Sequence, residues 1–412
     1  MKYKIKRTTL LKIITLLIIA STLNNYYYAI YKYAVNFPLA DDYDSILSFL
    51  NTWEDSNSKI ITLFSQHNEH RLVFLRIIVL IYYKLFSSIN FVHLILLGNF
   101  LFILLLVTLY NSTNDKRKFI LISPVFFLIL NSSFWETQTW AMGSLSNYPV
   151  LIFAFLSLYL INRSEIGYFC LGIFFALLSS FSQGNGMFVF FSGVLVLLRN
   201  RPRLISWVLI GLITIFTYFI LFPYQKPDAY PTVLFRFEKL FLINRIFYAL
   251  TLLSSVFQSK IILVVGVIPL LFILYIFKNH KQFSRLHLSM LSFVLISFVS
   301  LIISRDRFGY GQAFASRYQL NTVILYAVIY LCFLPNIRIR KHLALILLLS
   351  GLFNLNINMQ SKDDFYNRKV EILEDQICKN KCSHYKSYPN DIRAAEVLSA
   401  SMAKGIFTSS SK

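Results

Sequence analysis

The sequence predicts an all-α polytopic membrane protein with about 11–13 transmembrane helices. Of its 412 residues, 56% are hydrophobic and only 14% are charged, whereas soluble domains carry about 25% charged residues. The mean hydropathy is +0.59. The apolar residues form continuous runs, unlike the alternating pattern of a transmembrane β-barrel. We divide the chain into a membrane domain at 1–357 and a small helical extracytoplasmic tail at 358–412.

The first apolar segment, 8–30, follows the basic sequence MKYKIKR and lacks a small-residue cleavage site after it. We therefore expect an uncleaved membrane anchor and a cytoplasmic N-terminus. The net charge of +21 comes mainly from short basic loops, as the positive-inside rule predicts. It indicates membrane lipids as a partner and no nucleic acid. The basic loops expected in the cytoplasm are 1–7, 115–118, 162–165, 199–203, 278–285 and 336–341.

The number of membrane crossings depends on two ambiguous segments. We find about thirteen apolar segments, but about eleven crossings if every basic loop is cytoplasmic. Segment 72–88 contains Arg76 and Lys84, and segment 240–257 contains Arg245; a cation within the bilayer is costly. We expect both segments to be re-entrant or surface-lying helices. If both crossed, the intervening chain would invert and the loop of Glu136 would face the cytoplasm.

The long polar stretch 36–71 is the predicted active-site loop. Asp41 and Asp42 open it, just after the first membrane exit. One carboxylate could take the proton from an acceptor hydroxyl, and the other could hold the acceptor or a divalent cation. Alternatively, one of them caps a helix that begins near Tyr43. Asp44 is expected to be a first-turn helix charge.

The same loop ends in the cluster HNEHR, with His67, Glu69, His70 and Arg71. Arg71 is suited to clamp a phosphate through two hydrogen bonds. Glu69 could orient Arg71 or act as a second acid/base group. His67 and His70 could ligate a metal, but no further ligand lies at metal spacing, so we assign no metal site. The alternative is an interfacial salt-bridge cluster that anchors the following helix.

Two further external loops carry candidate substrate contacts. In FWETQTW, Trp135 is suited to stack on a sugar ring, beside Glu136 and Gln138, although an interfacial aromatic belt also explains the tryptophan. In the SQGNG turn, Gln183 and Asn185 could line the site, or the glycines could simply end a helix.

The stretch RDRFGYGQAFASRY places cations on the outer face, against the positive-inside trend. A lipid-linked phosphate would account for them, helped by glycines that let backbone N–H groups approach an anion. Pairing with Asp306 or with lipid headgroups is the alternative. The candidate residues here are Arg305, Arg307, Arg317 and Tyr318.

The tail predicts two short helices. Ser361 and Asp364 have the spacing of a capping box, and a second amphipathic stretch covers 390–404. Cys378 and Cys382 could pair if the tail is extracytoplasmic, but an i, i+4 pair on one helix is poorly placed for a disulfide.

The motifs ADDYD, QHNEHR, FWETQTW and GQAFASRY, in this order after a first transmembrane helix, resemble the GT-C superfamily of integral-membrane glycosyltransferases, within a branch associated with bacterial surface polysaccharides. The resemblance covers most of residues 8–357. It implies a GT-C-like fold with a long first extracytoplasmic loop and an acidic base or metal ligand at Asp41 or Asp42. It also implies a polyprenyl-phosphate sugar donor whose phosphate meets Arg71, Arg305 or Arg317. A divalent cation, Mg²⁺ or Mn²⁺, is compatible with it. The chain lacks a large soluble C-terminal domain, which argues against an oligosaccharyltransferase-like role.

We therefore expect a glycosyltransferase of the bacterial inner membrane, with its active site at the outer face. It would move a sugar from polyprenyl phosphate to a lipid-linked or cell-surface glycan. One alternative is an O-antigen-type polymerase or ligase, which needs external arginines but no acidic pair after the first helix. The other is a flippase for the same lipids, which would need ionisable residues lining a path through the helices.

Overall fold

The computed structural model describes residues 7–222, 224–225, 239–257, 262–335, 342–378 and 384–408. Within these ranges the regular elements are helices, together with two isolated bridges, so the predicted all-α class is confirmed for this part of the chain. Five of these helical segments are long and apolar enough to cross a membrane. They are Lys12–Tyr33, Phe91–Asn111, Ala141–Ile161, Arg201–Leu221 and Arg285–Arg305. The crossing count of about eleven stays a prediction.

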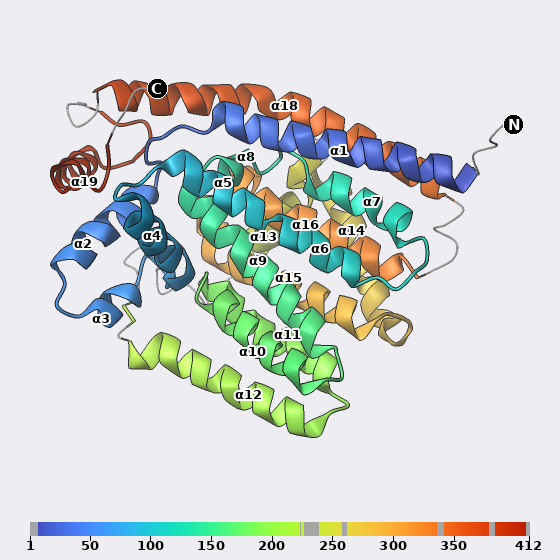
Figure 1. The fold of residues 1–412 in the computed structure, drawn as a ribbon. Helices are drawn as coiled ribbons and strands as arrows, with labels where there is room; N and C mark the ends of the chain where they lie inside the picture. Colours follow the sequence, from blue (N-terminus) through green and yellow to red (C-terminus); the bar gives the residue numbers. More distant parts are fainter. Residues whose placement is uncertain are drawn as a thin grey trace, which may run out of the picture. The chain divides into compact units, whose positions relative to one another are not determined.

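The chain forms two compact units, and Figure 1 shows the helices of both. Unit 1 comprises Met1–Ala29, Leu106–Phe134 and Thr232–Lys362, and unit 2 comprises Ile30–Leu105, Trp135–Pro231 and Asp363–Lys412. Three of the five boundaries fall within helices α1 (Arg7–Tyr33), α6 (Ile103–Asn111) and α18 (Leu343–Cys378). The predicted domain boundary at 357/358 also lies inside α18.

Unit 2 is arranged around α9, which is buried along nearly its whole length. Helices α5 and α10 lie against it (Figure 1). Small residues permit this close approach: a Cβ on Gly98 would meet the Ser144 hydroxyl at 2.5 Å. Ser157 also donates a hydrogen bond to the Gly172 carbonyl at 2.7 Å. Small and hydroxylated contact residues are typical of packed membrane helices.

Unit 2 also includes three short helices within the stretch 36–71, which the sequence predicted as a loop. The unit contains η1 (Tyr43–Ser48), α2 (Phe49–Asp55), α3 (Lys59–Leu63), α4 (Val73–Phe86), α5 (Phe91–Leu101), α8 (Trp135–Gln138), α9 (Ala141–Ile161), α10 (Ile166–Ser180), η2 (Gly184–Met187), α11 (Phe188–Leu197), α12 (Arg201–Phe216), η3 (Thr217–Leu221) and α19 (Asp391–Ala403).

Unit 1 is held together partly by polar side chains at helix ends. Asn354 of α18 donates to the carbonyls of Phe127 and Leu130 at the C-terminus of α7, at 2.8 and 2.7 Å. These bonds satisfy carbonyls that a helix end leaves without partners. Besides parts of α1, α6 and α18, the unit contains α7 (Lys118–Ile129), α13 (Lys239–Ser254), η5 (Ser255–Phe257), α14 (Ile262–Lys278), η6 (His280–Gln282), α15 (Arg285–Arg305), η7 (Asp306–Phe308), η8 (Tyr310–Phe314) and α16 (Ser316–Phe333).

Arg76 and Arg245, two of the three cations that made segments 72–88 and 240–257 ambiguous, both have protein partners. Arg76 of α4 is buried and donates to the Leu63 carbonyl at the end of α3, at 2.9 Å. Arg245 of α13 pairs with Asp306 at 2.7 Å. Neither α4 nor α13 is among the five long apolar segments, so their predicted re-entrant character remains open.

The tail differs from its prediction at its start. Helix α18 continues from Leu343 to Cys378, so the predicted capping box at Ser361 is wrong. Ser361 is buried inside this helix because the amphipathic pattern of the tail extends the preceding apolar helix without a break. The second predicted tail helix is confirmed as α19, which begins after the N-cap Asn390.

Cys378 is the last residue of α18 and is disulfide-bonded. The sequence disfavours a disulfide only if Cys378 and Cys382 lie on one helix. That condition is not met, because α18 ends at Cys378. Cys382 lies outside the described residues, as do the basic loop 336–341 and most of the external loop 223–239.

Candidate active site

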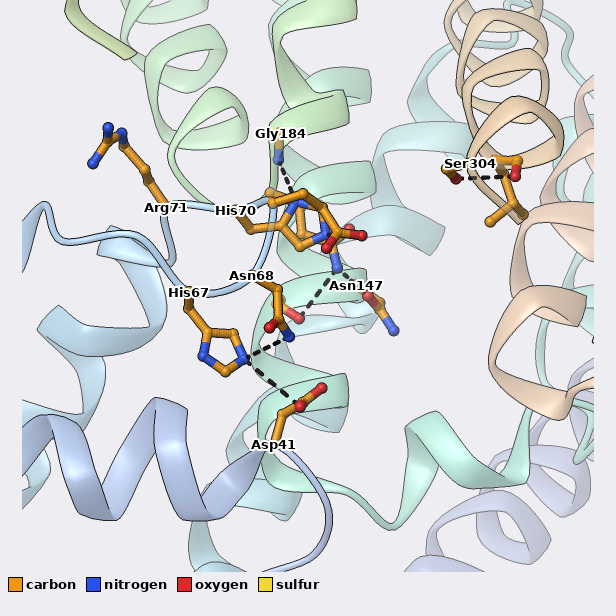
Figure 2. A network of polar contacts seen from close by, with 12 residues as sticks. Asp41, His67, Asn68, His70, Arg71, Asn147, Gly184 and Ser304 are labelled. Atoms are coloured by element: carbon orange, nitrogen blue, oxygen red, sulfur yellow. Dashed lines mark hydrogen bonds and ion pairs between the residues drawn. The ribbon is translucent and has the colours of Figure 1, made fainter. Parts of the chain in front are cut away.

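The HNEHR cluster folds as a tight reverse turn in unit 2. His67 N–H donates to the His70 carbonyl and His70 N–H to the His67 carbonyl, both at 2.8 Å. Asn68 has a φ of +48°, a conformation that asparagine tolerates better than most residues. The turn therefore presents its histidines from a fixed backbone, as Figure 2 shows.

Asp41 faces this turn. Its carboxylate Oδ1 lies 3.8 Å from His67 Nε2, which is also 3.4 Å from the Asn68 amide nitrogen (Figure 2). The Asp41 side chain is 38% exposed and that of His67 is 8% exposed. Burial lowers the pKa of His67, although the Asp41 carboxylate opposes that shift. The pair thus combines an accessible carboxylate with a buried imidazole that favours its neutral form.

Asp42 has a different environment, although it is the next residue. It is buried, and its two carboxylate oxygens accept the N–H groups of Leu39 at 3.1 Å and of Met142 at 2.7 Å. Met142 lies in the first turn of α9, whose own N-cap residue makes no side-chain capping bond. Asp42 therefore caps α9, and not the helix that begins at Tyr43, where it makes no capping bond. The predicted helix start at Tyr43 is confirmed.

Burial raises the pKa of Asp42 to about 8, and the N–H groups of Met142 and Leu39 oppose this rise. Desolvation disfavours the charged form of a carboxyl group. The two adjacent aspartates are thus separated by environment: Asp42 is a buried helix cap, and Asp41 is the carboxylate that a substrate could reach.

A second set of polar groups lies next to the turn. Gly184 N–H donates to His70 Nδ1 at 3.3 Å, and the Glu69 carboxylate lies 3.8 Å from His70 Nε2. Gln183 donates to the Asn147 amide oxygen of α9 (Figure 2). The SQGNG turn is therefore brought to the HNEHR turn, as expected if it lines the site. Asn147 was not recognised in the sequence, because it sits within an apolar helix and matches no motif.

Arg71 points into the protein. Its guanidinium donates to the carbonyls of Tyr218 at 2.7 Å and Phe222 at 2.6 Å, and also to that of Phe64. The residue is 1% exposed. These contacts hold the end of η3 against the first loop. The guanidinium N–H groups of Arg71 donate to backbone carbonyls here. Phosphate binding by Arg71 stays a prediction.

The FWETQTW loop meets the tail helix within unit 2. Glu136 lies 3.6 Å from Arg368 of α18, whose guanidinium also lies over the Trp135 ring at 5.5 Å. Gln138 is buried, and its carbonyl accepts a hydrogen bond from Asn99 at 2.9 Å. Trp135 and Glu136 are partly exposed, so a sugar contact is feasible for them and less so for Gln138. No sequence pattern identified Arg368 as the partner of Glu136.

The predicted anion-binding arginines belong to unit 1. Arg305 ends α15, and Arg317 lies in the first turn of α16 with its guanidinium over the Tyr318 ring at 5.2 Å. Asp306, proposed as an alternative partner for these arginines, pairs with Arg245. The side chain of Arg307 lies outside the described part of the structure.

A metal ion would need several close oxygen or nitrogen ligands. Among the described residues, no group of three His, Cys, Asp or Glu side chains could hold one.

Comparisons with known proteins add no family to this geometry. No protein-family model matches the chain, and no curated protein or solved structure matches it significantly.

Proposed function

We propose that the protein is a membrane glycosyltransferase that moves a sugar from a polyprenyl-phosphate donor to a lipid-linked or cell-surface glycan, with Asp41 as the general base. The observation that carries the proposal is the contrast within the acidic pair. Asp42 is buried as a helix cap, whereas the Asp41 carboxylate is accessible and lies beside His67.

The proposed reaction follows from the position of Asp41. Its carboxylate accepts the proton of an acceptor hydroxyl while that oxygen attacks the anomeric carbon of the donor. The bond between the anomeric carbon and the phosphate oxygen breaks, and polyprenyl phosphate leaves with both electrons of that bond. His67 Nε2 lies 3.8 Å from this carboxylate, and its proposed role is to position the base, since positioned groups react faster than free ones.

Two features support an extracytoplasmic site. The disulfide at Cys378 is of a kind that persists in oxidising compartments and is rare in the cytosol. The tail that follows it contacts the first loop: Arg393 of α19 pairs with Asp44 at 3.3 Å. We propose that the first loop and the tail both lie on the outer side of a bacterial inner membrane, with the N-terminus in the cytoplasm.

The polyprenyl-phosphate donor rests on the resemblance to GT-C enzymes. Arg305 and Arg317 belong to unit 1, and phosphate binding by them stays a prediction from the sequence on which the proposal for Asp41 does not depend.

The test is donor specificity in purified, reconstituted protein. Labelled sugar is offered on polyprenyl monophosphate, as a polyprenyl-diphosphate oligosaccharide, or as a nucleotide sugar, with a lipid-linked glycan acceptor. We expect transfer from the monophosphate donor alone. Joining of oligosaccharide blocks instead would favour the polymerase or ligase, and movement of lipid across the bilayer without transfer would favour the flippase.

A further inference from the structure

The C-terminal tail touches the predicted catalytic loop at the residue before Asp41. Ala40 N–H donates to the Ser387 carbonyl at 2.7 Å. The Ser387 hydroxyl is also hydrogen-bonded to the Tyr43 hydroxyl at 3.0 Å. These two contacts bracket the acidic pair on both sides in sequence. Both Tyr43 and Ser387 are buried, so water does not compete with the contacts.

The backbone at Ala40 depends on such support. Its φ is +48°, in the left-handed region that costs free energy for an alanine. A residue keeps this conformation only where its surroundings hold it there. Because Asp41 is the next residue, the direction of its side chain follows from this backbone.

Asp375 of α18 fixes Ser387 in turn. Its Oδ2 accepts Ser387 N–H at 2.6 Å and its Oδ1 accepts Lys386 N–H at 3.1 Å. Asp375 is 2% exposed. An ionised carboxylate can accept both N–H groups, whereas an asparagine would turn its own N–H₂ group towards one of them.

We infer that Asp375 and Ser387 are positioning residues of the active site, through which the tail sets the direction of Asp41. The inference rests on the proposed function for its catalytic consequence, but not for the structural coupling. It assigns the tail a part in catalysis, where the sequence predicted only a small helical tail.

Hydrogen exchange of the Ala40 amide tests the coupling without any assay of transfer. In full-length protein in detergent, Asp375→Asn should speed this exchange at least about tenfold. The buried Ser387 N–H loses its acceptor, so the Ser387 carbonyl no longer holds the Ala40 N–H as firmly. Glu374→Gln is the matched control: Glu374 neighbours Asp375 but pairs with the exposed Lys386 ammonium. Unchanged Ala40 exchange in Asp375→Asn, or an equal increase in Glu374→Gln, would overturn the inference.

Kinetics then test the consequence. Asp375→Asn should lower kcat about 10–100-fold with little change in the KM for the donor, since a displaced base slows the chemical step. Asp391→Asn controls for a loosened tail, because Asp391 accepts the Tyr385 N–H at 2.7 Å and not that of Ser387. Faster Ala40 exchange with an unchanged kcat would refute the positioning role. An inactive wild-type protein would instead refute the proposed function and leave the exchange result standing.

Discussion

The Asp42 carboxylate accepts the backbone N–H of Met142 at 2.7 Å, across one hundred residues of sequence. This bond joins the first loop to the N-terminus of α9, the most buried long helix of unit 2. A negative or hydrogen-bonding group at this end satisfies free N–H groups and complements the helix dipole. The bond between Asp42 and Met142 therefore anchors the backbone that carries Asp41.

We predict that Asp42→Ala destabilises the protein by about 1–3 kcal/mol, because two buried N–H groups lose their acceptor. Thermal unfolding in detergent measures the effect. Asp44→Asn is the matched control, since its partially exposed pair with Arg393 should contribute less than about 1 kcal/mol. Equal melting temperatures for wild type and Asp42→Ala would contradict the capping role.

The raised pKa of Asp42 predicts a pH dependence of stability. Because its pKa is about 8 in the folded protein and near 4 when unfolded, the folded state binds this proton more tightly. Its stabilising contribution is complete below about pH 4 and is lost as the pH rises towards 8. The melting temperature of wild type should therefore fall between pH 5 and 8 more steeply than that of Asp42→Asn. Parallel pH profiles would show that Asp42 is ionised in the folded state.

Arg71→Lys should lower stability by about 2–3 kcal/mol, since one ammonium group cannot replace a fork that serves several carbonyls. The expected result is a lower melting temperature. If Arg71 instead binds the donor phosphate, the variant would keep its melting temperature and show a raised KM for the donor.

His67→Gln should lower kcat about 10–100-fold, because Asp41 loses its neighbour in the turn. The melting temperature should change little. His93→Gln provides a control, since His93 of α5 contacts Tyr82 at 2.7 Å away from this turn. If His67→Gln kept the kcat of wild type, the His67 imidazole would have no role in positioning Asp41.

The sequence was sufficient for the helical class, because continuous apolar runs predict helices locally. The helix start at Tyr43 follows from the same local rules. The other short helices within 36–71 and the reverse turn of HNEHR were not predicted, because a polar composition alone indicates only a loop.

The roles within the acidic pair could not be read from the sequence. Asp41 and Asp42 are adjacent and chemically identical, and only contacts with Met142 and His67 separate them. The same holds for Arg71, whose partners lie in η3, and for Glu136 and Arg368. The uninterrupted α18 was missed because a capping pattern at Ser361 is a local signal, and packing of the longer helix overrides it.

The most direct test of the account compares sugar transfer by Asp41→Asn and Asp44→Asn in reconstituted protein, with folding verified by melting temperature. Both changes replace a carboxylate of the same loop with an amide. Asp41→Asn should lose about 10²–10⁴-fold in kcat, while Asp44→Asn should stay within about threefold of wild type. Full transfer by a folded Asp41→Asn protein would contradict Asp41 as the base.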